Sequence, residues 1–313
     1  MNQTEPASDR ERIVETAWRD QAVWSRAADR LKAELTAWRG RAAIAGVAGA
    51  FLQTLAASPL LKAVERWWWL RPSIALAGAI ILAVVPYVLR TKVTKERVKD
   101  WVRARSTSEA LKEVIYRYLV GVRPFGPASS PGELVARCGK IKKKVEDLNL
   151  HAASVEPPQK TRPRALTVDE YVEARVNDQV ERYYLPKGHG KALAAKRLHA
   201  LEFWLGVLAL VMGSLASAAA ATGCAQLSMV GPWVAVATTA GATVTAHLAA
   251  SRCDHEAIVY FGTADRLTAL RDRWASDPNR SDPARIARFV DDCEHAISTE
   301  NEAWLAKWIR DQS

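Results

Sequence analysis

The chain has 313 residues, of which 49% are apolar and 25% charged, and its formal net charge at pH 7 is +10. We expect no nucleic-acid partner from this charge, because the basic residues flank uncharged blocks, where they would face anionic lipid. The four cysteines form no CxxC pair, and no nucleophile, acid–base pair or metal-ligand cluster is visible. The sequence therefore argues against an enzyme, and we expect no cofactor and no metal site.

Four blocks without Asp, Glu, Lys or Arg decide the fold class. A helix needs about 20 apolar residues to cross a bilayer, and each block is close to that length. The blocks are Ala42–Leu61, Pro72–Leu89, Phe203–Ala221 and Val230–Ala250. They predict an all-α membrane protein whose four transmembrane helices form two hairpins, joined to cytoplasmic helical bundle or coiled-coil segments.

The distribution of basic residues predicts the orientation, since short loops rich in Lys and Arg stay in the cytoplasm. Eighteen of them lie within 20 residues of the ends predicted to be inside, against three in the connector Lys62–Arg71 and none in Thr222–Met229. Trp67, Trp68 and Trp69 fall in the first connector, and tryptophan favours the membrane interface. We expect both connectors outside, both termini in the cytoplasm, and a bacterial inner (cytoplasmic) membrane as the location.

An apolar stripe precedes the first block. Its residues recur every three or four positions, at Trp24, Ala28, Leu31, Leu35 and Trp38. This spacing lets two helices pack along their length. The stripe is a candidate assembly seam between subunits, and the alternative is packing inside one chain, as in a helical bundle.

Small residues in the spans are candidates for close helix packing. Gly46 and Ala50 in the first block, and Gly213 and Ser217 in the third, stand four residues apart on one helix face. Such pairs let two transmembrane helices approach closely.

Breaker residues divide the chain in its middle. Residues 126–131 (GPASSP) interrupt the first polar region, and residues 151–166 form a proline-containing linker without helical period. Thr167 and Glu170 then have the spacing of a capping box and predict a helix start. The run Lys187–Lys191 (KGHGK) lacks the spacing of a phosphate-binding loop, so we predict a loop or helix break there.

The fourth block carries the clearest polar pattern among the spans. Thr238, Gly241 and Thr245 share one helix face, and Thr239 and Thr243 form an adjacent strip. One interpretation is a hydroxyl-lined pore surrounded by several subunits. The alternative is that the hydroxyls bond back to their own helix while the small residues pack the hairpins together.

The two halves of the chain repeat one architecture: a polar lead-in helix, a hairpin of two spans, and a following cytoplasmic helix. The second pair of spans begins about 160 residues after the first. Both hairpins run in–out–in, so the repeat is parallel. The predicted units are residues 1–150 and 167–313, and the second ends in a helix over residues 282–312, with Pro283 in its first turn.

Positions flanking the hairpins resemble a known family. After the first hairpin stand Arg105–Lys112 (RSTSEALK), Tyr116, Tyr118 and Gly121–Phe125 (GVRPF). Around the second stand Tyr171–Val176 (YVEARV), Gln179, Tyr183, Tyr184, Tyr260, Thr263, Ala264, Leu267 and Trp274. Together they resemble tandem SLATT domains, two-transmembrane effector domains that associate with SMODS nucleotidyltransferases and SLOG sensors. The Pro186–Gly190 segment departs from the family's more continuous helix.

The resemblance implies a function in bacterial conflict, such as defence against phage. A cytoplasmic sensor protein or a nucleotide signal would trigger a membrane effector that forms a gated oligomeric pore or channel. The expected partners are then the lipid bilayer, further copies of the chain in a homo-oligomer, and the sensor or signal. The alternative is a membrane anchor or scaffold whose cytoplasmic coils recruit partners.

Overall fold

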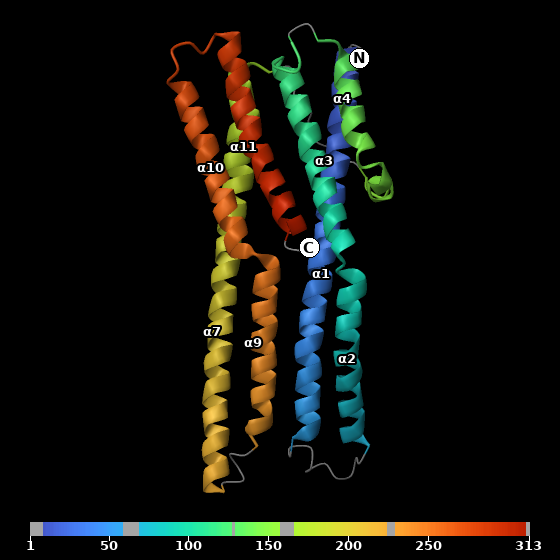
Figure 1. Ribbon diagram of the computed structural model, residues 1–313, viewed down its shortest axis with the longest axis vertical. Helices are drawn as coiled ribbons and strands as arrows, with labels where there is room; N and C mark the ends of the chain where they lie inside the picture. Colours follow the sequence, from blue (N-terminus) through green and yellow to red (C-terminus); the bar gives the residue numbers. More distant parts are fainter. Residues whose placement is uncertain (1–8, 59–68, 127–128, 157–165, 224–228, 311–313) are drawn as a thin grey trace, which may run out of the picture. The chain divides into compact units, whose positions relative to one another are not determined.

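The computed structural model describes residues 9–58, 69–126, 129–156, 166–223 and 229–310, with side chains up to residue 299. Within these ranges the chain is helical, without a strand, and the predicted all-α class is confirmed. Most of the elements are long α-helices, drawn in Figure 1. They are α1 (Asp9–Ala57), α2 (Leu70–Lys92), α3 (Lys95–Val120), α4 (Pro131–Lys143), the 3₁₀ turn η2 (Glu146–Leu148), α5 (Asn149–Ala153), α6 (Val168–Tyr171), the π-helix η3 (Val172–Tyr184), α7 (Leu185–Thr222), α9 (Gly231–Ser251), α10 (Cys253–Ala275) and α11 (Pro283–Arg310).

Residue contacts divide these helices into two compact units. The polar unit comprises residues 1–33, 95–189 and 257–313, and the apolar unit comprises residues 34–94 and 190–256. Both halves of the sequence contribute to each unit. The division of the sequence into two repeated units stays a prediction.

The apolar unit contains the four predicted spans. The helical stretches that contain α1, α2, α7 and α9 are long and apolar enough to cross a membrane, so the chain is a membrane protein. Figure 1 shows α1 beside α2, and α7 beside α9, as the two predicted hairpins. Trp67, Trp68 and Cys224 of the connectors lie outside the described residues, whereas Trp69 is described and is 47% exposed.

Two glycines bring the helices of the first hairpin together. A Cβ added at Gly78 would lie 3.1 Å from the Gly49 carbonyl oxygen, and one added at Gly49 would lie 2.7 Å from Leu82 Cγ. The Gln53 amide also donates to the Ala75 carbonyl at 2.8 Å. This close approach therefore depends on having no side chain at either glycine.

Two contacts between the hairpins lie at one end of the apolar unit. The rings of Phe51 and Trp233 lie edge to face with their centroids 5.3 Å apart. The Thr54 hydroxyl lies 3.5 Å from the Pro232 carbonyl oxygen, to which it donates. These residues join the end of α1 to the beginning of α9.

Aromatic side chains form the core of the polar unit. Trp18 of α1 contacts Tyr116 of α3, which contacts Tyr171 of α6, each pair with ring centroids 6.0 Å apart. Tyr171 in turn lies 6.4 Å from Phe289 of α11, whose ring stacks on Trp274 of α10 at 4.7 Å. One row of rings thus connects five helices drawn from both halves of the sequence.

Two predicted helix starts are confirmed. The Thr167 hydroxyl accepts from the Glu170 backbone N–H, and a Glu170 carboxylate oxygen accepts from the Thr167 N–H at 2.7 Å, so both bonds of the capping box are present. Helix α11 begins at Pro283, where the Asp282 carboxylate accepts from the Ala284 N–H at 2.9 Å. Residues 157–165 of the predicted linker lie outside the described residues.

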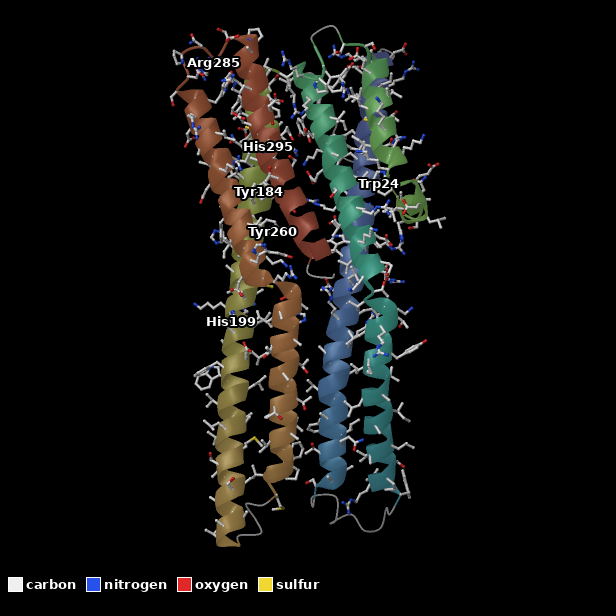
Figure 2. The ribbon with its side chains drawn as sticks, in the orientation of Figure 1. Trp24, Tyr184, His199, Tyr260, Arg285 and His295 are labelled. Carbon is white, nitrogen blue, oxygen red and sulfur yellow. The ribbon has the colours of Figure 1, made fainter. Side chains whose placement is uncertain are left out.

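The predicted loop or break at Lys187–Lys191 is wrong, because α7 runs through these residues without interruption. The glycine serves close packing instead. A Cβ added at Gly188 would lie 2.9 Å from the Phe261 ring, and the His189 ring lies edge to face with the same ring at 5.0 Å. Figure 2 shows Tyr184 and Tyr260 nearby on the same two helical stretches, with ring centroids 6.2 Å apart.

Candidate functional site

The hydroxyl groups of the predicted pore face are bonded within the chain. Thr238 donates to the Val234 carbonyl at 3.0 Å, and Thr243 to the Thr239 carbonyl at 2.7 Å, so both bond back to their own helix. Thr245 lies 3.1 Å from the Gly241 carbonyl and 2.5 Å from Glu202 Oε1 on α7. Each of these three hydroxyls therefore has an acceptor without a second subunit.

The two strips of α9 face different neighbours. A Cβ added at Gly241 would lie 3.9 Å from Leu205 of α7, so Gly241 and Thr245 turn toward the partner helix of their own hairpin. Thr239 and Thr243 instead line a groove shared with α1 and α2. Thr238 is exposed. Thr245 is exposed too, but its hydroxyl also bonds to Glu202 of α7, whereas the hydrogen bonds of Thr238 stay within α9. Pore lining by these five residues stays a prediction.

The predicted packing pairs differ from the close approaches found inside the chain. A Cβ added at Gly46 or Gly213 would meet nothing within 4 Å. Ala50 is partly buried and Ser217 is exposed. The tight contact of the first hairpin is instead between Gly49, which stands next to Ala50 on α1, and Gly78 of α2.

The candidate assembly seam is largely covered by the chain itself. Trp24, Ala28, Leu31 and Leu35 are buried, which agrees with the alternative of packing inside one chain. Figure 2 shows Trp24 among the side chains of the polar unit. Trp38 is only partly buried, and Arg41 and Lys92 lie over its ring.

A buried ion pair that the sequence analysis did not single out is the central polar feature of the polar unit. Arg175 Nε and Nη2 donate to the two carboxylate oxygens of Glu294 at 2.9 and 2.7 Å. The side chains are 1% and 0% exposed. The Tyr171 hydroxyl donates to the same carboxylate at 2.9 Å, and the Arg175 guanidinium lies 5.1 Å above the Tyr116 ring. The pair is thus fully hydrogen-bonded on the glutamate side, as a buried carboxylate must be.

The third nitrogen of Arg175 has no such bond. Nη1 is buried without a hydrogen-bond partner among the described residues, and Glu109 Oε2 of α3 lies 3.9 Å away, within ion-pair distance only. A second ion-pair cluster follows on α3, where Arg117 binds Glu113 at 2.9 Å and also pairs with Asp291 of α11. These contacts link α3 of the first half to η3 and α11 of the second.

Ionisable groups around the pair have shifted pKa values. Burial, and secondly the positive charge of Arg175, lower the pKa of Lys112 to about 8. Burial raises the pKa of Tyr116 to about 12. Burial, and then the negative charge of Glu294, raise the pKa of Glu113 above its ordinary value. Burial by itself lowers the pKa of the Arg175 guanidinium. The charge and hydrogen bonds of Glu294 have the larger effect, so the pKa is raised.

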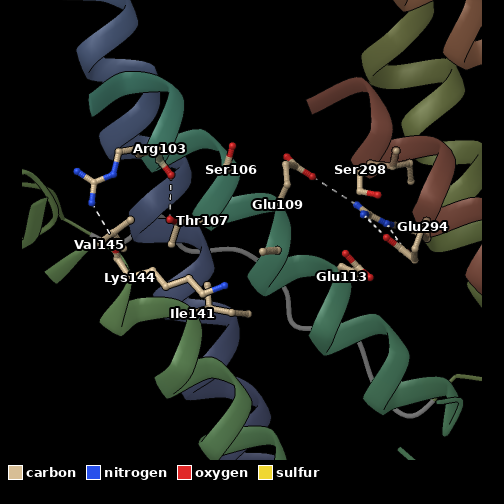
Figure 3. A pocket seen from close by; sticks show the side chains of 13 residues that line it. Arg103, Ser106, Thr107, Glu109, Glu113, Ile141, Lys144, Val145, Glu294 and Ser298 are labelled. Atoms are coloured by element: carbon tan, nitrogen blue, oxygen red, sulfur yellow. Dashed lines mark hydrogen bonds and ion pairs between the residues drawn. The ribbon is translucent and has the colours of Figure 1, made fainter. Parts of the chain in front are cut away.

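A cavity of about 390 Å³ opens beside the ion pair (Figure 3). Its polar wall includes Arg175, Glu109 and Glu113, and its apolar wall includes Ile141 and Ile297. A cavity of this size can hold a small molecule, and most of the residues that line it are polar or charged. The unbonded Nη1 can donate there to a ligand that offers an acceptor. Among the described residues, no group of three His, Cys, Asp or Glu side chains is placed to hold a metal ion.

The sequence did contain one signal for this site. Tyr171, Arg175 and Gln179 recur every four residues in the lead-in region of the second half, and all three are buried. A charged residue inside such a stripe predicts a buried partner. Nothing in the local sequence identified Glu294, 119 positions away, as that partner.

Comparison with protein families places the second half of the chain. Residues 171–304 match the family model described as SMODS and SLOG-associating 2TM effector domain 1, or SLATT. Residues 171–304 are a SLATT domain. The match spans η3, α7, α9 and α10 and reaches into α11, so Arg175, Glu294 and the second hairpin all belong to the SLATT domain.

The first half matches a different description. Residues 22–132 match a family of unknown function, DUF4231, which covers most of α1 together with α2 and α3. A second SLATT domain in this half stays a prediction. Neither the curated proteins nor the solved structures yield a match to this chain.

Proposed function

We propose that this chain is a membrane effector that forms a gated oligomeric pore or channel in a bacterial conflict system. The observation that carries the proposal is the low burial of its apolar helices. Only 22% of the first candidate span, and 6% of each of the other three, is buried inside the chain. Surfaces this open are covered by lipid or by further subunits, and the SLATT description names an effector domain.

A conducting path needs several copies of the chain. The hydroxyls of Thr238, Thr243 and Thr245 are satisfied by acceptors inside one chain, so one copy offers no continuous polar surface. In an oligomer, the exposed Thr238 side of α9 from each copy would surround the path. Such a neutral lining discriminates weakly among ions and can close by dewetting.

The trigger would act on the polar unit. The Arg175 cavity has walls from α3, α4, η3 and α11, which come from both halves of the chain. A sensor protein or a nucleotide signal that favours one packing of these helices would shift the equilibrium between closed and open states. This cavity is our candidate for the place where the signal is received.

We also propose that the protein resides in the bacterial inner membrane with both termini in the cytoplasm. Cysteine labelling of intact cells tests this orientation. Cys138 and Cys293 are buried, so their protection would not report the side of the membrane. Leu150 is 84% exposed, and a Leu150→Cys variant should react only after permeabilisation, whereas Cys224 should react in intact cells. Labelling of both sites at the same rate in intact cells contradicts the orientation.

An anchor or scaffold is the second candidate. It is favoured by Val135 and Leu150, apolar side chains of the polar unit that are 53% and 84% exposed and offer a surface for a partner. Dye release from vesicles separates the two functions. The full chain, reconstituted at a high protein-to-lipid ratio, should form oligomers and release dye under an applied voltage. Oligomers that conduct nothing across the whole voltage range would favour the anchor.

A further inference from the structure

A groove of about 550 Å³ lies in the apolar unit between the two hairpins. Three helices form its walls, namely α1, α2 and α9. Side chains that line it include Ala42, Gly46, Leu89, Ala242 and Ala246. Most of the lining is apolar, and the groove therefore belongs to the part of the chain that meets hydrocarbon.

The two hairpins are joined at one end of the apolar unit. Phe51 and Thr54 of α1 contact α9 at Trp233 and Pro232. Along the groove, α1 carries small residues including Ala42 and Gly46, and α9 carries alanines including Ala246. A Cβ added at Gly46 would meet nothing within 4 Å, so the groove is open there.

Neither a void nor water suits this space. An empty groove leaves its lining without dispersion contacts on one side, and a buried water needs two to four polar partners. The polar side chains of the wall are Arg39, Thr239, Thr243 and His247, and the Thr243 hydroxyl is already donated to the Thr239 carbonyl. The other nine lining residues are Ala, Gly, Val or Leu, so most of the groove offers water no partner. A flexible apolar chain from the bilayer would supply the dispersion contacts and would need no hydrogen-bond partners.

One end of the groove is basic. Arg39 lines it three residues before the first uncharged block begins, at the level where lipid headgroups lie. Arg41 and Lys92 stand nearby over the Trp38 ring, at 4.7 and 5.7 Å from its centroid. No acidic side chain lines the groove. Basic pockets between transmembrane helices are a recognised setting for anionic headgroups.

We propose that this groove binds one anionic phospholipid, with an acyl chain between the hairpins and the phosphate at Arg39. The apolar walls select the chain, and Arg39 selects the charge of the headgroup. The proposal does not depend on pore formation, because an anchor with the same hairpins would bind the same lipid.

Lipid retention by the full chain tests the proposal. The protein is loaded in vesicles of equal phosphatidylglycerol and phosphatidylcholine, exchanged into mild detergent, and weighed intact by native mass spectrometry. We expect wild type to retain phosphatidylglycerol at least about fivefold over phosphatidylcholine, the preference that one basic residue near the headgroup supplies. Equal retention of the two lipids overturns the proposal.

Two pairs of variants locate the site. Ala246→Leu fills the groove and should lose the retained lipid, while Ala249→Leu, on an exposed position of the same helix outside the groove, should keep it. Arg39→Gln should lower the preference for phosphatidylglycerol about fivefold, while the exposed Arg90→Gln should not. Unchanged retention in Ala246→Leu, or equal effects of the two arginine variants, overturns the assignment.

A second copy of the chain is the competing occupant. Ala246→Cys would then form a disulfide dimer in the membrane, and wild type would retain no lipid. That result overturns the proposal. The arginine variants keep the test decisive even if the larger side chain at Ala246 prevents folding.

Discussion

Arg175 and Glu294 form a bidentate ion pair in the interior of the polar unit, between η3 and α11. A buried pair of this kind adds little net stability, because desolvation of both charges opposes their attraction. Its loss on one side only is costly, since the remaining charge has no water and no partner. The pair therefore fixes which helices pack together more than it increases stability.

Replacement of one partner should destabilise the polar unit strongly. Arg175→Met leaves the Glu294 carboxylate buried without its guanidinium, and we expect a loss of about 3–5 kcal/mol in the free energy of unfolding. The double variant Arg175→Met/Glu294→Leu removes both charges and should recover most of that loss. Denaturant unfolding in mild detergent measures all three proteins.

Arg182 supplies the matched control on the same helix. It pairs with Asp178 at 3.6 Å, but its side chain is 85% exposed, so Arg182→Gln should unfold like wild type. A loss in Arg175→Met no larger than in this control would show that the buried pair is not a packing constraint.

Lys112 should make the free energy of unfolding depend on pH between about pH 8 and 10.5. Its pKa is lowered from 10.5 to about 8 by burial and by Arg175. Between these values the unfolded chain binds a proton that the folded chain lacks, so stability rises with pH across the window and is lowest below pH 8. Lys112→Met removes this cost and should be more stable than wild type at pH 7, by about 2 kcal/mol after allowance for partial exposure.

The difference between the two proteins isolates the lysine. Other groups titrate in the same range, for example Cys138, whose pKa burial raises to about 11, but both proteins share them. Unfolding curves at pH 7, 8, 9 and 10 should show the advantage of the variant shrinking with pH. The exposed Lys140→Met is the control. An advantage that stays constant from pH 7 to 10 would contradict the assignment.

Gly78 should tolerate substitution less well than Gly46. A Cβ at position 78 would lie 3.1 Å from both the Gly49 carbonyl oxygen and Leu52 Cβ, so Gly78→Ala must push the hairpin helices apart, at about 1–3 kcal/mol. Gly46→Ala meets open space and gains helix propensity. Thermal unfolding in detergent should place Gly78→Ala below wild type and Gly46→Ala at or above it. The reverse order would mean that the hairpin is packed differently.

Those features of the fold that depend on local sequence were predictable. A block without charges, such as Pro72–Leu89, predicts a span because unpaired charges are expensive in hydrocarbon. The capping box at Thr167 and the start of α11 at Pro283 depend on neighbours within three residues. In each case the physical cause lies inside the segment that shows the pattern.

Features that depend on distant residues were not predictable in the same way. Gly188 looks like a helix breaker in sequence, but Phe261 packs on it from another helix and the segment stays helical. The close approach of Gly49 depends on Gly78, which stands in a different span. The stripe of Tyr171, Arg175 and Gln179 indicates that Arg175 is buried, but the partner Glu294 stands 119 positions away. A single sequence does not show which residues of two helices lie opposite each other, and these contacts depend on that alignment.

The pore prediction is best tested at Thr238. Its side chain is exposed and its hydroxyl bonds to the Val234 carbonyl of its own helix, so Thr238→Val removes the hydroxyl with little change in shape. If α9 surrounds a path in an oligomer, this change makes the lining more apolar, and dewetting should close it more readily. We expect slower ion flux in vesicles and lower toxicity on expression, with an unchanged oligomeric state.

Ser214 on α7 provides the control for this test. It is likewise exposed, and its hydroxyl bonds to the Leu210 carbonyl four residues earlier at 2.9 Å. Ser214→Ala removes a similar group from the other helix of the same hairpin and should leave the flux unchanged. Thr245 is less suitable, because its hydroxyl also lies 2.5 Å from Glu202 and its loss would disturb the hairpin itself. If wild type and Thr238→Val show equal flux, or if Ser214→Ala lowers the flux as much as Thr238→Val does, α9 does not line the path.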